Sequence, residues 1–191
     1  MNYNFGVYGD SIAFGYGNNN QSWFDILFKN QSIKLAQNGE KIEDVLIKIR
    51  LDNNHYNALF LAVGINDLLS NTPKNIHNII PNLINKYREI LKETLNKSSK
   101  IVVQSVLPVR EELFPNQTWL DEDKWVFNSD IKIFNQNLAA LCSELKVQYI
   151  DAYSKFYSKN LADIYSDAVH LNKKGQETLL TIYEEHLEPH S

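Results

Sequence analysis

Five short apolar segments alternate along this chain with longer segments of helical periodicity. The apolar segments are residues 5–8, 33–36, 58–63, 101–106 and 147–150. Segment 58–63 reads Ala-Leu-Phe-Leu-Ala-Val, which is apolar on both faces, as a strand inside a parallel sheet requires. The alternation predicts an α/β fold with a parallel sheet covered by helices on both faces, a three-layer α/β/α sandwich.

The segments between the predicted strands carry apolar residues at helical spacing. They predict helices over residues 23–28, 42–49, 75–95, 131–145 and 172–187. Ser22 precedes the first of these helices and is a preferred residue for an N-cap. Pro81 lies within 75–95, where its missing N–H is expected to begin or kink a helical segment.

Composition limits the class of protein. A chain of 191 residues with 43% hydrophobic residues suits one folded domain, so residues 1–191 are predicted to form a single domain. A net charge of −4 without a basic stripe argues against a nucleic-acid partner. The single cysteine, Cys142, excludes an internal disulfide and a zinc site built from several cysteines.

The ends of the chain and its apolar runs suggest where the protein resides. The N-terminus lacks the basic and apolar regions of a signal peptide. No apolar run approaches the ~20 residues that span a bilayer, so stable membrane insertion is not expected. We therefore expect a cytoplasmic protein.

Four chemically distinctive positions follow predicted strands. Ser11 follows the first strand, Gly39 the second and Asn66 the third. His170 follows the fifth strand, with Asp167 three residues before it. Ligands of open parallel sheets bind beyond the carboxyl ends of the strands. These residues are therefore expected to meet at one edge of the sheet.

Their side chains and backbone suit acyl transfer. A serine hydroxyl becomes a nucleophile when a base takes its proton, so His170 would activate Ser11. Asp167 would hold the other ring nitrogen and stabilise the imidazolium. The backbone N–H groups of Ser11 and Gly39 and the amide of Asn66 would bind the developing oxyanion.

Each fragment alone has a more common structural role. Asp10-Ser11 and Asn66-Asp67 could cap helices, and Gly39 could be a turn glycine. Asp167 and His170 could be half of a metal site, although no third ligand is apparent in the sequence. The case for catalysis depends on all the fragments occurring together at strand ends.

In these segments the chain resembles the SGNH hydrolase superfamily, the GDSL-type esterases and lipases. The blocks that carry the resemblance are residues 7–17 (Val-Tyr-Gly-Asp-Ser-Ile-Ala-Phe-Gly-Tyr-Gly), 38–39 (Asn-Gly), 64–67 (Gly-Ile-Asn-Asp) and 167–172 (Asp-Ala-Val-His-Leu-Asn). Two residues depart from the family pattern. Ile12 replaces a leucine, and Ala168 replaces a glycine between Asp167 and His170.

The resemblance implies a fold, a reaction and a set of residues. It implies a flavodoxin-like sheet of five parallel strands in the order 2-1-3-4-5, and ester hydrolysis through an acyl-enzyme, without a metal or organic cofactor. The implied catalytic residues are Ser11, Asp167 and His170. The implied oxyanion hole consists of Ser11, Gly39 and Asn66.

The long irregular stretch 107–125 is the best candidate for a substrate wall. Residues 110–125 mix aromatic and charged side chains, which suits a polar ligand better than a lipid. We therefore expect a small-molecule ester with a short acyl group, such as the acetyl ester of a carbohydrate or another polar metabolite. The stretch could also be a surface lid anchored by its tryptophans.

Other functions remain open from the sequence. The same chemistry would serve a thioesterase or lysophospholipase with longer acyl chains, or an acyltransferase in which an alcohol replaces water. The fold could also serve as a non-catalytic ligand-binding module.

Overall fold

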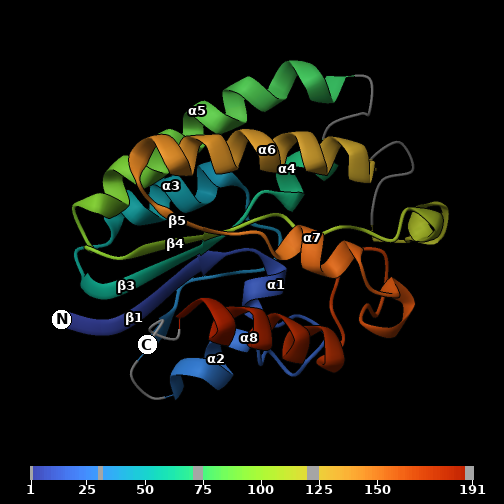
Figure 1. The fold of residues 1–191 in the computed structure, drawn as a ribbon, viewed down its shortest axis with the longest axis horizontal. Coiled ribbons are helices and arrows are strands. Elements are labelled where there is room, and N and C mark those ends of the chain that lie inside the picture. Colours follow the sequence, from blue (N-terminus) through green and yellow to red (C-terminus); the bar gives the residue numbers. More distant parts are fainter. Residues whose placement is uncertain (1, 30–31, 71–74, 120–124, 188–191) are drawn as a thin grey trace.

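The computed structural model describes residues 2–29, 32–70, 75–119 and 125–187. Within them the strands form one parallel sheet in the order β2-β1-β3-β4-β5 (Figure 1). The strands are β1 (Asn2–Gly9), β2 (Ser32–Lys34), β3 (His55–Ala62), β4 (Ile101–Gln104) and β5 (Gln148–Ile150). The predicted α/β fold class and strand order are confirmed.

Helices cover both faces of this sheet, as Figure 1 shows. One face carries α3 (Ile42–Leu51), α5 (Ile76–Leu95) and α6 (Asn128–Leu145). The opposite face carries α2 (Trp23–Phe28) and α8 (Lys173–Leu187). Three shorter helices, α1 (Ser11–Phe14), α4 (Ile65–Leu69) and α7 (Ala152–Tyr157), follow strand ends. The three-layer sandwich is therefore present, with short helices where the strands open into loops.

Alternating residues of the buried strands supply two hydrophobic cores. In β3, Leu59 and Leu61 belong to the core shared with α3, α5 and α6. Phe60, between them, belongs to the core shared with α2 and α8. Successive side chains of a strand point to opposite faces, so an uninterrupted apolar strand fills both layers.

Aromatic side chains dominate the α2/α8 layer. The ring of Trp23 stacks on Tyr183 with centroids 3.5 Å apart. Phe60 meets both rings at steep angles, and the Tyr183 hydroxyl donates to Oε1 of Gln104 at 3.0 Å. Ser22 begins α2 as its N-cap, as predicted. These contacts fix α2 and α8 against the sheet.

Several element bounds differ from the sequence prediction, and so does the role of Pro81. Strands β2 and β4 end at Lys34 and Gln104, two residues earlier than the apolar runs suggested. Helix α5 continues through Pro81, so the proline does not begin a segment. Pro81 and His77, the residue four positions earlier, are both exposed, so water can satisfy the His77 carbonyl that loses its backbone donor.

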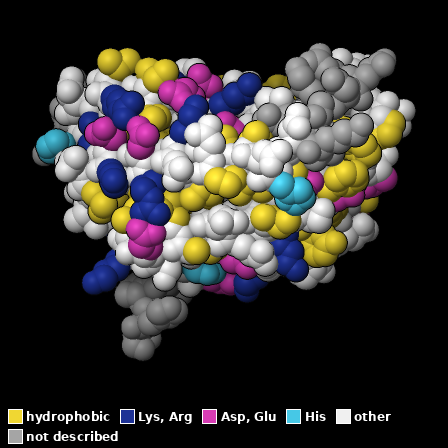
Figure 2. Space-filling model, turned by 90° about the horizontal axis from the view of Figure 1, so that it is seen from above, with side chains coloured by type: hydrophobic (Ala, Val, Ile, Leu, Met, Phe, Trp, Pro, Cys, Tyr) yellow, Lys and Arg dark blue, Asp and Glu magenta, His cyan; other side chains and the backbone are white. Residues whose placement is uncertain are grey.

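The face above α3, α5 and α6 carries interspersed positive and negative side chains (Figure 2). Arg50 of α3 pairs with Glu89 of α5 at 2.7 Å, and Lys86 pairs with Glu43. Such exposed pairs contribute little to stability individually. Within the described part of the chain, no helix has the length and apolar character needed to cross a bilayer.

Candidate active site

Backbone hydrogen bonds hold together the loops that follow the first three strands. The N–H of Asp10 donates to the carbonyl of Ala62 at 3.1 Å, which links the ends of β1 and β3. The N–H of Gln37 donates to the carbonyl of Gly9 at 3.1 Å, which brings in the loop after β2. The segments that carry Ser11, Gly39 and Asn66 therefore share one edge of the sheet, as predicted.

Ser11 is the first residue of the short helix α1. Asp10 is its N-cap, and the Asp10 carboxylate accepts a hydrogen bond from the N–H of Ile12 at 3.0 Å. Ser11 is 4% exposed. The cap fixes the chain direction as it leaves β1, so the Ser11 hydroxyl has a defined position next to the edge of the sheet.

Asp167 and His170 lie in a tight turn before α8. An antiparallel bridge between Tyr165 and Leu171 closes the turn, and the N–H of Ser166 donates to the carbonyl of His170 at 2.8 Å. Oδ1 of Asp167 accepts from the N–H of His170 at 2.7 Å. The turn therefore orients both side chains before any substrate binds.

Ala168, which stands where the family has glycine, fits this turn. It is buried, and its φ lies outside the positive range in which glycine is favoured. Its carbonyl accepts a hydrogen bond from the N–H of Arg110 at 2.8 Å. The departure from the family pattern therefore leaves the arrangement of Asp167 and His170 intact.

The structure brings Ser11, His170 and Asp167 into one hydrogen-bonded row. Oγ of Ser11 lies 3.1 Å from Nε2 of His170, and Nδ1 of His170 lies 2.7 Å from Oδ2 of Asp167. An ionised carboxylate can only accept, so Nδ1 carries the ring proton and Nε2 of the neutral ring can accept from Ser11. Burial opposes the ionisation of Asp167, but hydrogen bonds from His170 hold its pKa below the ordinary value.

Asn66, in α4, and Gly39, in the loop after β2, lie at the same edge of the sheet. Nδ2 of Asn66 donates to the carbonyl of Glu40 at 2.9 Å, which leaves its second N–H for another acceptor. Gly39 has a φ of +77°, a conformation that strains residues with a side chain. Gly64, with a φ of +140°, is the N-cap of α4, the short helix that carries Asn66.

Two buried carboxylates of the same region accept hydrogen bonds from backbone N–H groups at the starts of helices. Burial raises the pKa of Asp10 to about 7, and the nearby Asp67 and Glu40 add to the shift. Burial also raises the pKa of Asp67 to about 6, and its Oδ2 accepts from the N–H of Ile42, the first residue of α3, at 3.0 Å. These contacts show Asp10 and Asp67 shaping the loops that carry the candidate residues.

Two exposed aromatic rings flank His170. The ring centroid of Tyr16 lies 4.4 Å from that of His170, and the centroid of Trp119 lies 5.3 Å away. Trp119 belongs to the loop predicted to form a substrate wall, whereas Trp125 packs on Phe127. Residues 120–124 of that loop lie outside the described residues. Tyr16 was not identified from the sequence as a site residue, although it lies between two glycines just after the C-cap of α1.

Within the described ranges, no group of three or more His, Cys, Asp or Glu side chains is arranged to hold a metal ion. Cys142 is a buried free thiol in α6, and burial raises its pKa to about 12. A thiol that stays protonated and buried is a poor metal ligand and a poor nucleophile.

The fold is shared with several solved structures. A lipolytic protein of the G-D-S-L family from Veillonella parvula is 16% identical, with a TM-score of 0.70 over 97% of this chain and 98% of that chain. An acetyl xylan esterase is 17% identical, with a TM-score of 0.72 over 96% and 99%. An acetylxylan esterase from Geobacillus stearothermophilus is 13% identical, with a TM-score of 0.69 over 98% and 94%.

The sequence itself matches a family model over most of its length. No curated protein matches the chain. The model of the GDSL-like Lipase/Acylhydrolase family matches residues 7–178. That range includes Ser11, Gly39, Asn66, Asp167 and His170. The chain therefore belongs to the GDSL-like lipase/acylhydrolase family.

Proposed function

We propose that this protein is a serine esterase that removes short acyl groups, acetyl foremost, from a carbohydrate or another polar metabolite. One observation carries the proposal: Ser11, His170 and Asp167 form a continuous hydrogen-bonded row with distances of 3.1 and 2.7 Å. That row is the arrangement by which a serine hydroxyl is activated for attack on a carbonyl carbon.

Acylation is the first half of the proposed reaction. Nε2 of His170 takes the hydroxyl proton of Ser11 as Oγ attacks the ester carbonyl, and Asp167 stabilises the imidazolium. The carbonyl oxygen becomes an oxyanion, which the N–H groups of Ser11 and Gly39 and the Asn66 amide would bind. The backbone N–H of Ser11 is available because the first N–H groups of a helix have no partner within the helix.

Collapse of this intermediate completes the transfer of the acyl group. The bond between the carbonyl carbon and the alcohol oxygen breaks, His170 gives its proton to the leaving alcohol, and the acyl group stays on Ser11. In the second half, His170 takes a proton from water and the hydroxide attacks the acyl-enzyme. Breaking the bond to Oγ releases the carboxylic acid and restores the Ser11 hydroxyl.

The surroundings of His170 support a polar substrate with a short acyl group. Tyr16 and Trp119 present rings that are 47% and 46% exposed, and such rings can stack on the apolar face of a sugar. Two structural neighbours are named as acetyl xylan esterases, which agrees with this choice of acyl group and alcohol.

Hydrolysis of p-nitrophenyl esters from acetate to palmitate, by wild type and Ser11→Ala side by side, tests the proposal. We expect turnover to be greatest with acetate or butyrate and to be lost in Ser11→Ala, with the fold retained by circular dichroism. Greatest turnover with long chains would identify a lysophospholipase-type or thioesterase-type enzyme instead. Turnover that persists in Ser11→Ala would contradict the assignment of the nucleophile.

A further inference from the structure

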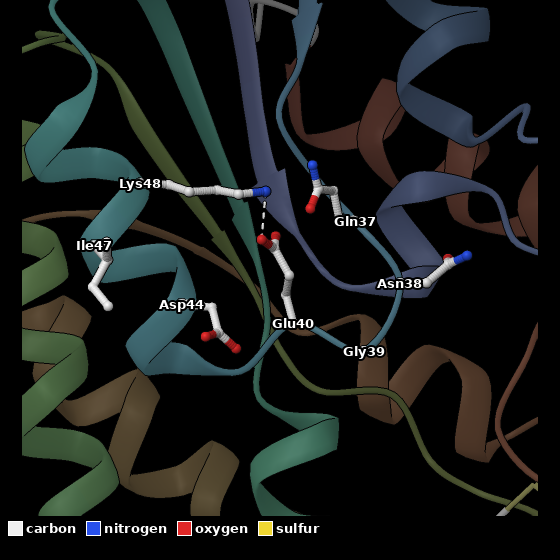
Figure 3. Close-up of a pocket in the computed structure, with 7 residues that line it drawn as sticks. All are labelled: Gln37, Asn38, Gly39, Glu40, Asp44, Ile47 and Lys48. Carbon is white, nitrogen blue, oxygen red and sulfur yellow. Dashed lines mark ion pairs between the residues drawn. The ribbon is translucent and has the colours of Figure 1, made fainter.

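A polar pocket of about 340 Å³ adjoins the loop that carries Gly39 (Figure 3). It lies between the loop after β2 and the exposed side of α3. Its lining residues are Gln37, Asn38, Gly39, Glu40, Asp44, Ile47 and Lys48. Gly39 belongs both to this pocket and to the proposed oxyanion hole, so a ligand in the pocket would lie next to the reacting ester.

The two oxygens of the Glu40 carboxylate have different surroundings. Its side chain is 7% exposed, and one oxygen forms an ion pair with Lys48. Among the residues that the structure describes, the other oxygen, Oε2, has no hydrogen-bond partner. Figure 3 shows Glu40 and Lys48 pointing toward each other within the pocket. A buried acceptor without a donor is unfavourable, so a ligand donor that reached this carboxylate would be stabilised.

Lysine and loop contacts hold this carboxylate in place. Nζ of Lys48 also donates to the carbonyl of Leu35 at 3.0 Å, so the ammonium is tied to the end of β2. The backbone carbonyl of Glu40 accepts from Nδ2 of Asn66 at 2.9 Å. Glu40 therefore lines the pocket with its side chain and contacts Asn66, the proposed oxyanion donor, with its backbone carbonyl.

The chemistry of the lining selects among ligands. Two carboxylates and one ammonium give the pocket a formal charge of −1, which disfavours phosphates and carboxylates. Ile47 is its one aliphatic side chain among the residues named above, which disfavours an acyl chain. Carboxylate and amide oxygens accept hydrogen bonds, while the amides of Gln37 and Asn38 also donate them. A neutral compound with several hydroxyl groups satisfies both kinds of partner.

We propose that this pocket binds the alcohol part of the substrate as a neutral polyhydroxylated group, with one hydroxyl donating to the carboxylate of Glu40. The proposal rests on the proposed esterase function. Gly39 lines the pocket and also belongs to the proposed oxyanion hole, and a Cβ atom on it would meet no described atom within 4 Å. The substrate can therefore place its ester at Ser11 and its remaining hydroxyls in the pocket.

The test compares two acetyl esters that differ in their alcohol, a monoacetylated methyl xyloside, which keeps free hydroxyl groups, and p-nitrophenyl acetate. The ratio of their kcat/KM values isolates recognition of the sugar. We expect Glu40→Gln to lower this ratio about tenfold, because the hydrogen bond to a charged carboxylate is replaced by a weaker one to a neutral amide oxygen. Glu43→Gln is the matched control, because Glu43 pairs with Lys86 and does not line the pocket. Its ratio should equal that of wild type.

A second variant tests the pocket independently, in case Glu40→Gln does not fold. Gln37 is exposed, so Gln37→Ala should fold normally and lower the same ratio to a lesser degree. An unchanged ratio in both variants would overturn the pocket assignment and leave the esterase function standing. A wild type that hydrolyses p-nitrophenyl acetate but not the sugar ester would have the same meaning. A wild type that hydrolyses neither ester would overturn the esterase function and the subsite together.

Discussion

At the scale of single residues, the site separates groups that would react from groups that hold them. Ser11, His170 and Asp167 are joined side chain to side chain. Asp10 and Asp67 accept backbone N–H groups at helix starts instead. Asp10 and Asp67, each one residue from a candidate site residue, therefore have structural contacts. Substitutions there should affect stability, whereas substitutions in the hydrogen-bonded row should affect activity.

Asn66→Ala tests the proposed oxyanion donor. We expect kcat toward p-nitrophenyl acetate to fall ~10²- to 10³-fold, because one such donor contributes ~3 kcal/mol in the transition state. KM should change little, since the charge develops only in the transition state. Steady-state kinetics separate the two constants. A raised KM with an unchanged kcat would assign Asn66 to substrate binding alone.

Asp10→Asn tests the buried carboxylate at the N-cap of α1. Its pKa in the folded protein is about 7, against an ordinary value of 3.8. Between those values the folded protein keeps a proton that the unfolded chain has released, so this group reduces stability as the pH rises toward 7. The asparagine variant avoids that loss and keeps an acceptor for the Ile12 N–H.

Urea unfolding of both proteins at about pH 5 and about pH 8 measures the effect. The free energy of unfolding of Asp10→Asn minus that of wild type should increase by about 2 kcal/mol from the lower to the higher pH. A difference between the two proteins that stays constant with pH would show that Asp10 ionises normally in the folded state.

At the scale of elements, the sequence predicted the long helices and α2 but missed three other short helices. The long helices were found because apolar residues recur over several turns, as in α5 and α6. Helices α1, α4 and α7 have four to six residues, which is too few for a clear periodic pattern. Helix α2 is as short, but Ser22 marks its start in the sequence. Helices α1, α4 and α7 form because Asp10, Gly64 and Asp151 end the preceding segments at their N-caps.

The row of Ser11, His170 and Asp167 was predictable because these residues occur in recognisable blocks at strand ends. The sequence could not show that Tyr16 and Trp119 lie beside His170, since that contact depends on how two loops fold over the sheet edge. It also could not show that Glu40 is buried beside Lys48. A charged pair near a loop is usually solvated, and only packing of the loop against α3 encloses this one.

Asp52→Ala tests how α3 is fixed to the sheet. Asp52 is the C-cap of α3, and its Oδ2 accepts from the hydroxyls of Tyr8 in β1 and Tyr56 in β3, both at 2.5 Å. Removing the carboxylate leaves two mostly buried hydroxyls without this acceptor. We expect the free energy of unfolding to fall by about 2 kcal/mol.

The exposed carboxylate of Asp163 provides a control for this change. Asp163→Ala should alter the free energy of unfolding by no more than about 0.5 kcal/mol, because its ion pair with Lys174 spans 3.9 Å at the surface. If the two variants unfold at the same urea concentration, the hydrogen bonds to Asp52 do not fix α3.

At the scale of the whole molecule, both hydrophobic cores share the same strands. Because Leu59, Phe60 and Leu61 alternate between the two layers, neither layer can lose its packing without disturbing the sheet. Residues 1–191 should therefore unfold as one cooperative unit. Urea transitions followed by tryptophan fluorescence and by far-ultraviolet circular dichroism are expected to coincide, whereas separate midpoints would indicate two independently folding parts.

The measurement that bears most directly on the proposed chemistry is covalent labelling with a fluorophosphonate, followed by peptide mass spectrometry. The phosphonyl group accepts attack by an activated serine and releases fluoride. We expect one adduct, on Ser11, that forms rapidly in wild type, slowly in His170→Ala and not at all in Ser11→Ala. Folded wild type that remains unlabelled, or is labelled on another residue, would contradict the assignment of Ser11 as the nucleophile.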